Sequence, residues 1–267
     1  VNVRAGMFSI STMEGTSSSA ITIGTAQNAG GLTVGKASLN GANVFLDPAW
    51  KDGGNLVSDA SIGVFESFAN GAVDGRFAVG RNSLLVLGDK DSAWAQKAVQ
   101  DALDNADLTW GKDSVTAALA IKSSQKLSAT GALLVDGSLA TAPSVTENTA
   151  TFAGQSLLVV NAAAADGEGA LQGDGTSRLS VDGGAKLHIM DVKGSQEYTV
   201  TSGFVNDKIE GWQGDDLIVS RLFNAAVNTD GGKFVVKTEA KRPDEFSQYA
   251  IPNILAAIAS GNVNNPD

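Results

Sequence analysis

The chain has 267 residues, enough to bury a sizeable core, and its charged fraction of only 18% argues against a disordered, highly solvated chain. It has no cysteine, which excludes a disulfide scaffold, cysteine-ligated zinc and a thiol nucleophile. Its formal net charge of −10 argues against a surface that follows nucleic-acid phosphates, and no window approaches the roughly 18 apolar residues of a membrane helix.

Short apolar strands joined by tight turns recur along the chain. The 31 glycines indicate many such turns. The recurring phrase is an apolar-x-apolar strand, a short Gly/Asp/Ser turn and another apolar strand. It begins at Gly30, Gly75, Lys126, Thr151 and Ser177, with a truncated copy from Ala20. The residues before the turns are Val34, Val79, Ala129, Ala153 and Val181, and the long gaps between them are about twice the short ones, as if one degenerate copy were skipped each time.

A spacing of roughly 20–30 residues is the size of a solenoid rung, which buries its apolar face only against neighbouring rungs. Alternate residues of a strand then point inward. We expect this of the pairs Leu32/Val34, Phe77/Val79 and Leu179/Val181, followed by corners at Gly35, Gly80 and Asp182. The sequence therefore predicts an all-β fold, a right-handed parallel β-helix with a helical insertion and a C-terminal cap.

An antiparallel sandwich or barrel would show similar short strands. Its hairpins favour Asn-Gly and Asp-Gly turns, and such dipeptides occur at positions 40–41, 70–71, 136–137 and 182–183. That alternative stays open at the level of sequence.

One segment breaks the β pattern. The stretch near 91–106 can be capped by Asp91 or Ser92, and its apolar residues fall on one helical face. These are Trp94, Ala95, Ala98, Val99, Ala102 and Leu103. We expect a helix packed on the solenoid wall in preference to a protruding contact element. A weaker helical pattern follows Pro243.

The last third of the chain has larger side chains, more charge and a hairpin signal at Asp230-Gly231-Gly232. A solenoid needs its last rung covered, because an open end is a sheet edge. We therefore assign residues 1–195 to the β-helix rungs, residues 196–245 to a C-terminal cap and residues 246–267 to a terminal helix or linker segment.

The sequence contains fragments of known catalytic and binding motifs, but none of them is complete. His188 is the single histidine, and we expect a surface or hydrogen-bonded residue and not a catalyst. The stretch from Gly30 to Lys36 resembles a phosphate loop, but Ala37 replaces the Ser/Thr and no helix follows. Gly211, Gly214, Asp216 and Ile218 match part of a calcium-binding nonapeptide, but Trp212 replaces a glycine and no second copy adjoins it. We predict no catalytic, cofactor-binding or metal-binding residues.

The chain resembles the passenger domain of a Gram-negative autotransporter of the pertactin-like or AIDA-like kind. The resemblance covers the loose rungs from about Gly30 to Asp191 and the Tyr198–Val236 segment. In the latter, Tyr198–Gly203 reads as Y-x-V-x-S-G, Gly211-Trp212 as a Gly-Trp phrase, Leu217–Val219 as the hydrophobic strand that follows, and Gly231–Val236 as GG-x-F-x-V. That segment is similar to the autochaperone of the family.

The resemblance implies export through the outer membrane and display at the cell surface, often with an adhesive role. It also implies a covalent translocator barrel after Asp267 in the precursor. The GDSGSP motif of the protease passengers is absent. We expect a non-enzymatic surface module, an adhesin or its stalk, that binds a protein or glycan of a host or neighbouring cell, with the loop 47–59 or the helix as contact sites. The alternatives are a carbohydrate-active enzyme on a β-helix scaffold and a calcium-stabilised β-roll.

Overall fold

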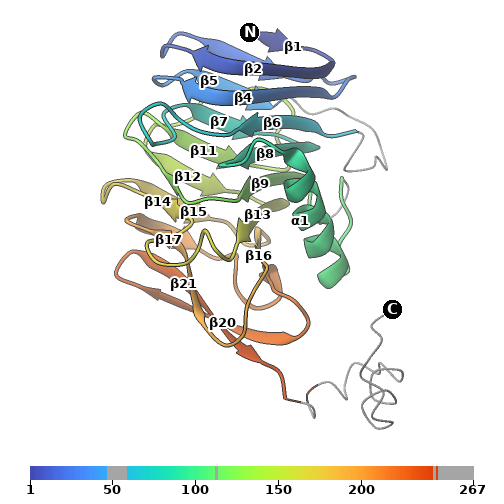
Figure 1. Ribbon diagram of the computed structural model, residues 1–267, viewed down its shortest axis with the longest axis vertical. Coiled ribbons are helices and arrows are strands. Elements are labelled where there is room, and N and C mark those ends of the chain that lie inside the picture. The colour runs from blue at the N-terminus through green and yellow to red at the C-terminus, as the bar shows by residue number, and fades with distance from the viewer. Residues whose placement is uncertain (47–58, 112–113, 243–244, 246–267) are drawn as a thin grey trace.

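The chain coils into a parallel β-helix, as the sequence predicts (Figure 1). The computed structural model describes residues 1–46, 59–111, 114–242 and 245. Two eight-stranded sheets, in which all strands are parallel, form the long walls, and a mixed five-stranded sheet lies toward the C-terminal end. The sandwich or barrel alternative is wrong, because consecutive strands alternate between the two walls instead of pairing as hairpins.

The first wall, sheet A, is built from strands that are mostly four residues long. In spatial order they are β1 (Asn2–Val3), β3 (Ala20–Ile23), β5 (Asn43–Leu46), β7 (Arg76–Val79), β11 (Ala132–Val135), β12 (Thr149–Phe152), β15 (Arg178–Val181) and β18 (Val205–Ile209).

The second wall, sheet B, has longer and more apolar strands. From the N-terminal end they are β2 (Gly6–Glu14), β4 (Gly30–Ser38), β6 (Ser61–Phe65), β8 (Ser83–Leu87), β9 (Ala117–Ile121), β13 (Ser156–Asn161), β16 (Lys186–Met190) and β19 (Leu217–Ile218). The short 3-10 helix η1 (Gly214–Asp216) precedes β19.

The third sheet, sheet C, combines two short rung strands with the C-terminal strands. Its order is β10 (Gln125–Lys126), β14 (Leu171–Gln172), β17 (Glu197–Ser202), β21 (Lys233–Ala240) and β20 (Phe223–Asp230). The last two form an antiparallel hairpin at Gly231 and Gly232, whose φ angles of 57° and 75° suit the two-residue turn that the sequence predicts there.

The core lies between sheets A and B and consists of columns of aliphatic side chains. The predicted inward pairs Leu32/Val34, Phe77/Val79 and Leu179/Val181 are all buried there. One column of sheet B runs through Val34, Phe65, Leu87, Ile121, Val160 and Ile189 in direct register. Each fully buried side chain of this size contributes about 1.5–3 kcal/mol, so stacked rungs gain the burial that no rung has alone.

The corners differ in part from the prediction. Gly35 is not a corner: β4 continues through it to Ser38, and a Cβ at Gly35 would lie 2.8 Å from the Ser11 carbonyl oxygen of the adjacent rung. The turn comes instead at Asn40 and Gly41, with φ angles of 48° and 79°. Gly80 and Asp182 do follow the ends of their strands, β7 and β15. The Asn-Gly pair thus joins two walls and not two strands of a hairpin.

Helix α1 (Ser92–Asn105) lies against the outer face of sheet B, between β8 and β9 in the chain (Figure 1). Asp91 caps it by accepting a 2.8 Å hydrogen bond from the Ala93 N–H. Five of the six predicted apolar residues, all except the half-buried Trp94, are fully packed. The helix therefore covers the wall and does not protrude. The weaker pattern after Pro243 lies outside the described residues, apart from Glu245.

Within the described part of the chain, two connections leave the regular coil. Between β8 and β9 the chain runs through α1, and between β11 and β12 it runs through residues 136–148; each returns to the sheet that it left. Both pairs of strands are parallel, so each connection must cross back over its own sheet. We call residues 136–148 the return segment. Part of this segment lies beside the outer face of sheet A.

Candidate binding groove on sheet A

A groove of about 430 Å³ lies on the outer face of sheet A beside the return segment. Outward residues of β11, β12, β15 and β18 line it, because alternate residues of a strand face away from the core. The lining consists of Leu134, Thr149, Thr151, Arg178, Ser180 and Asp207 from the strands and Ser144, Val145 and Thr146 from the return segment. Five of the nine carry hydroxyl groups.

Strand register determines the order of the groove residues. Leu134, Thr151 and Ser180 occupy one outer column, since each pairs directly with the next. Thr149 and Arg178 lie side by side in the neighbouring column. The hydroxyls therefore project at the regular spacing of adjacent strands, about 4.8 Å.

A β-bulge positions the acidic residue of the groove. Leu179 pairs with Asn206 and Ser180 with Lys208, so Asp207 is an extra residue in β18. The Arg178 guanidinium donates from Nε and Nη2 to the two Asp207 carboxylate oxygens, at 2.6 and 2.8 Å. This bidentate hydrogen bonding raises the pKa of Arg178, which stays a cation. The bulge thus places a donor and an acceptor next to each other.

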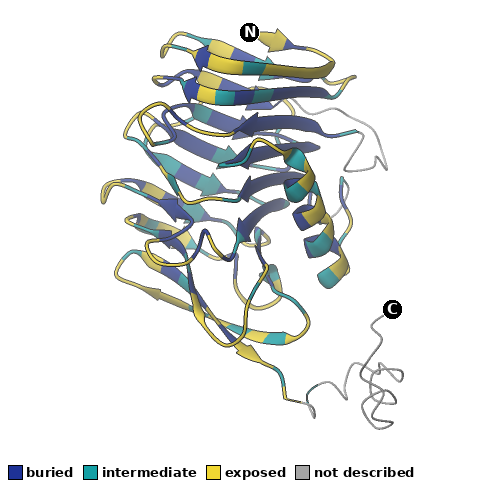
Figure 2. Cartoon of the chain, viewed as in Figure 1, coloured by how far each residue is buried: buried dark blue, intermediate teal, exposed yellow. Residues whose placement is uncertain are grey.

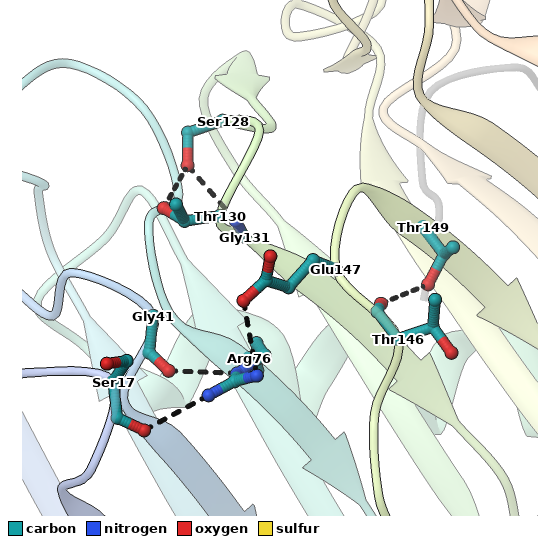
Figure 3. A network of polar contacts seen from close by, with 9 residues as sticks. All are labelled: Ser17, Gly41, Arg76, Ser128, Thr130, Gly131, Thr146, Glu147 and Thr149. Atoms are coloured by element: carbon teal, nitrogen blue, oxygen red, sulfur yellow. Dashed lines mark hydrogen bonds and ion pairs between the residues drawn. The ribbon is translucent and has the colours of Figure 1, made fainter.

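Arg76 holds the return segment against the wall (Figure 3). Its guanidinium donates to the Gly41 carbonyl at 2.8 Å and to the Ser17 carbonyl at 3.1 Å, and it pairs with Glu147 at 3.3 Å. The Thr149 hydroxyl donates to the Thr146 carbonyl at 2.7 Å, which fixes the end of the segment beside the groove. One arginine therefore ties turns of earlier rungs to the groove rim.

The start of the return segment is also anchored. The Arg81 N–H donates to the Leu139 carbonyl at 3.1 Å, and the Thr116 hydroxyl donates to the Gly137 carbonyl at 2.9 Å. Asp136 accepts hydrogen bonds from both the N–H and the hydroxyl of Ser138. With both ends fixed, the rim does not have to be ordered when a ligand binds, which lowers the entropic cost of binding.

The groove is suited to binding and offers little for catalysis by paired carboxylates. Glycoside hydrolysis in its common form uses two acidic groups on either side of the scissile bond. Asp207 is the one carboxylate among the lining residues, and both of its oxygens accept from Arg178. Hydroxyl groups, in contrast, can donate and accept, and the Arg178–Asp207 pair offers both roles at one point.

A larger hollow, of about 700 Å³, lies between the end of α1 and the β19–β20 region. Arg221 spans it and donates to the Asp104 carbonyl at 2.9 Å and the Asn105 carbonyl at 3.3 Å. These are terminal carbonyls of α1 that lack partners within the helix. This hollow is a seam that the chain uses to fix its own helix to the C-terminal strands.

His188 is buried, with 1% of its side chain exposed, and it is hydrogen-bonded at both nitrogens. Nδ1 lies 3.1 Å from the Ile218 carbonyl and Nε2 lies 3.0 Å from the Asp101 carboxylate on α1. Both partners are acceptors, so a ring nitrogen that carries a hydrogen can donate to the partner that it faces. His188 therefore fastens α1 to sheet B, which matches the expectation of a hydrogen-bonded residue.

The other sequence motifs have structural positions. Lys36 lies within β4, so the phosphate-loop pattern is part of a strand. Asp216 of the nonapeptide pattern accepts a 2.8 Å hydrogen bond from Lys186. Trp212, at a glycine position of that pattern, is buried with a φ of 60°. Among the residues that the structure describes, no three His, Asp or Glu side chains are grouped to hold a metal ion.

Sequence reasoning missed the groove and named other contact sites. Residues 47–58 of the expected contact loop, with Trp50, lie outside the described residues, and Trp110 is buried with its indole N–H 2.6 Å from the Asn82 side-chain oxygen. The alternation in TATF and RLSV places Thr151 and Ser180 outward and could have indicated the hydroxyl columns. The bulge at Asp207 has no such signal.

Comparison with known proteins does not identify a family for this chain. No family model matches the sequence, and neither curated proteins nor solved structures give a match. Over the described part of the chain, no helix is both long and apolar enough to cross a bilayer.

Proposed function

We propose that this chain is a non-enzymatic surface module that binds glycans through the groove on sheet A. The observation that carries the proposal is the pre-anchored groove itself, in which sheet A and the return segment together present five hydroxyl-bearing residues and an Arg–Asp pair. Sugars present neighbouring hydroxyls that must each find a donor or acceptor. Leu134 and Val145 add the aliphatic surface against which a sugar ring can pack.

The proposal extends to cell-surface display by a Gram-negative autotransporter. It is supported by the β-helix together with the Tyr198–Gly203, Gly211-Trp212 and Gly231–Val236 phrases of the C-terminal region. On this proposal the mature module lies outside the cell and is joined in its precursor to a translocator barrel. Reading the gene beyond Asp267 tests this part: about a dozen amphipathic strands would support it, and an unrelated soluble domain would contradict it.

Glycan binding is tested on arrays and then by calorimetry with the glycans that bind. We expect Thr151→Trp to fill the groove and abolish binding, and Arg178→Ala to weaken it by about tenfold, the loss of one charge-assisted contact. Thr22→Trp is the matched control, because Thr22 is an outward threonine at the other end of sheet A. Binding that survives Thr151→Trp, or an array without signal, would contradict the proposal.

The same samples separate binding from hydrolysis. A carbohydrate-active enzyme would shorten the bound glycan on incubation, which mass spectrometry detects. We expect the glycan to be recovered intact.

A further inference from the structure

The sequence contains two Asn-Gly pairs, at positions 40–41 and 70–71, and both lie in described turns. In such a pair the backbone nitrogen of the glycine can attack the side-chain carbonyl carbon of the asparagine, because glycine has no Cβ that obstructs closure of the ring. The dipeptide is the same at both positions, so the structure around each pair determines how readily it reacts.

The structure holds the first pair between neighbouring turns of the coil. The Asn40 side-chain amide donates to the Gly15 carbonyl and to the Ser38 hydroxyl, both at 3.2 Å. The Gly41 N–H, which carries the attacking nitrogen, donates to the Asp74 backbone carbonyl at 2.6 Å. A reaction at Asn40 must therefore first break hydrogen bonds to the turns on both sides.

The second pair lies in the connection between β6 and β7, where the surroundings are open. Asn70 is exposed, and its side chain forms no hydrogen bond with another described residue. Gly71 has a φ of 68°, and a Cβ added there would meet no atom within 4 Å. Its N–H donates to the Phe68 carbonyl of the same turn at 3.0 Å. The two reacting atoms can thus approach each other once this local hydrogen bond opens.

Both sides of this exposed turn are anchored to neighbouring rungs. The Ala69 N–H donates to the Ala37 carbonyl in β4, and the Val73 N–H donates to the Lys126 carbonyl in β10, each at 2.7 Å. Figure 2 shows the connections between the walls as largely exposed, in contrast to the buried strands in the middle of the coil. A change of the main chain within residues 70–72 therefore stays local, and the rungs keep their register.

We propose that Asn70 is a site of spontaneous deamidation in the folded protein. The Gly71 nitrogen loses its proton to solvent hydroxide and attacks the side-chain carbonyl carbon of Asn70. The bond from that carbon to Nδ2 breaks, and Nδ2 leaves as ammonia with a proton from water. Water then opens the cyclic succinimide at either carbonyl and gives aspartate or isoaspartate.

Each event at Asn70 adds one negative charge to a chain whose formal net charge is −10, and the isoaspartate product also adds one carbon to the main chain. Asn70 is not among the residues that line the groove on sheet A, so the proposal does not depend on glycan binding.

Peptide mapping by mass spectrometry of the folded protein, kept at mildly alkaline pH, tests the proposal. We expect Asn70 to be converted at least about tenfold faster than Asn40, because the reaction at Asn40 must break more than one additional hydrogen bond. In concentrated urea the two rates should become nearly equal, since both asparagines precede a glycine and the fold no longer distinguishes them.

Two variants complete the test. In Asn70→Gln, position 70 should remain unconverted over the same period, because the larger ring that glutamine would form closes less readily. Asn28→Gln is the matched control: Asn28 is also exposed but precedes Ala29, and its substitution should leave the conversion of Asn70 unchanged. Equal or reversed rates at Asn70 and Asn40 in the folded protein, or a difference in rate that persists in urea, would overturn the proposal.

Discussion

At the scale of the residue, one polar contact fixes the position of α1. The Asp101 carboxylate on the helix faces His188 on β16, across the outer face of sheet B. The hydrogen bond from His188 lowers the pKa of Asp101 below its usual range. A lowered pKa means that the folded protein favours the charged carboxylate, so this contact stabilises the fold where Asp101 is ionised.

Replacing Asp101 by Asn should therefore reduce stability in a pH-dependent way. The contribution is fully present above the unfolded pKa, near 4, and is lost as the pH falls through the lower folded value. Because the Asp101 side chain is 45% exposed, we expect a loss of less than about 1 kcal/mol at neutral pH. Urea unfolding of both proteins at neutral and acid pH measures it, and the difference should vanish in acid.

Asp166→Asn is the control, since Asp166 is an exposed aspartate on a loop. It should leave the free energy of unfolding unchanged at both pH values. An equal loss for Asp101→Asn at neutral and acid pH would show that the hydrogen bond to His188 is not the cause.

At the scale of the element, the strands of sheet B have apolar residues on both faces, so their outer face must be covered, and α1 covers it. The outer column of Ile62, Leu84, Ala118 and Leu157 is as buried as the inner columns, because α1 covers it. Ala118 and Ala120 present small side chains to the outer face, which leaves space for a closely packed helix. A continuous apolar strand such as SLLVL is the sequence signature of burial on both faces.

Val99→Asp should detach α1 from the wall. Val99 is completely buried between the helix and sheet B, so an unpaired carboxylate there costs at least about 2 kcal/mol. We expect hydrogen exchange to accelerate across residues 92–105, while β13, packed on the core side as well, stays protected. Gln96→Asp, at a half-exposed position of the same helix, should leave the exchange nearly unchanged.

The elements were predictable from the sequence to unequal degrees. The helix followed from local signals, a cap at Asp91 and apolar residues at helical spacing, and these are independent of the tertiary fold. The inward pairs followed from alternation along single strands. The prediction of a corner at Gly35 was wrong because glycine is favoured both in turns and where two backbones approach closely. Only the position of the neighbouring rung distinguishes the two cases.

The candidate groove depends on register, which single-strand patterns do not contain. Leu134, Thr151 and Ser180 come from three strands, and their alignment requires the return segment to bring β12 beside β11. Asp207 is recognised as the extra residue of a β-bulge only when β18 is aligned with its partner strand β15. Local sequence therefore predicted the rungs but not the surface that their stacking creates.

At the scale of the whole molecule, the C-terminal strands close the parallel coil. At the C-terminal end, Trp212 lies in the core between Phe152 and Phe234, with ring centroids 4.8 and 5.3 Å away. β17 pairs with β21 there, so the parallel coil ends against an antiparallel hairpin.

Trp212→Ala should destabilise the C-terminal end of the coil. Removal of a buried tryptophan costs about 3–5 kcal/mol, through lost burial and the cavity left behind. In a stacked fold the loss acts first on neighbouring rungs, so hydrogen exchange should rise in β15–β18 before it rises in β3–β6. Leu222→Ala, which removes an exposed side chain of the same region, should cost little. Uniform loosening of all rungs would contradict this localisation.

The helix that covers sheet B also determines how the molecule would respond to tension. Rungs of a simple solenoid touch only their neighbours, so a pulled chain can peel one rung at a time. α1 follows β8 in the chain but also contacts β13 and β16, and Asp101 bonds to His188 on the latter. A force that reaches β8 must therefore break the contacts of α1 with several rungs before the chain can extend further. We expect extension to proceed in small steps up to this point and then to release a long stretch of chain at once.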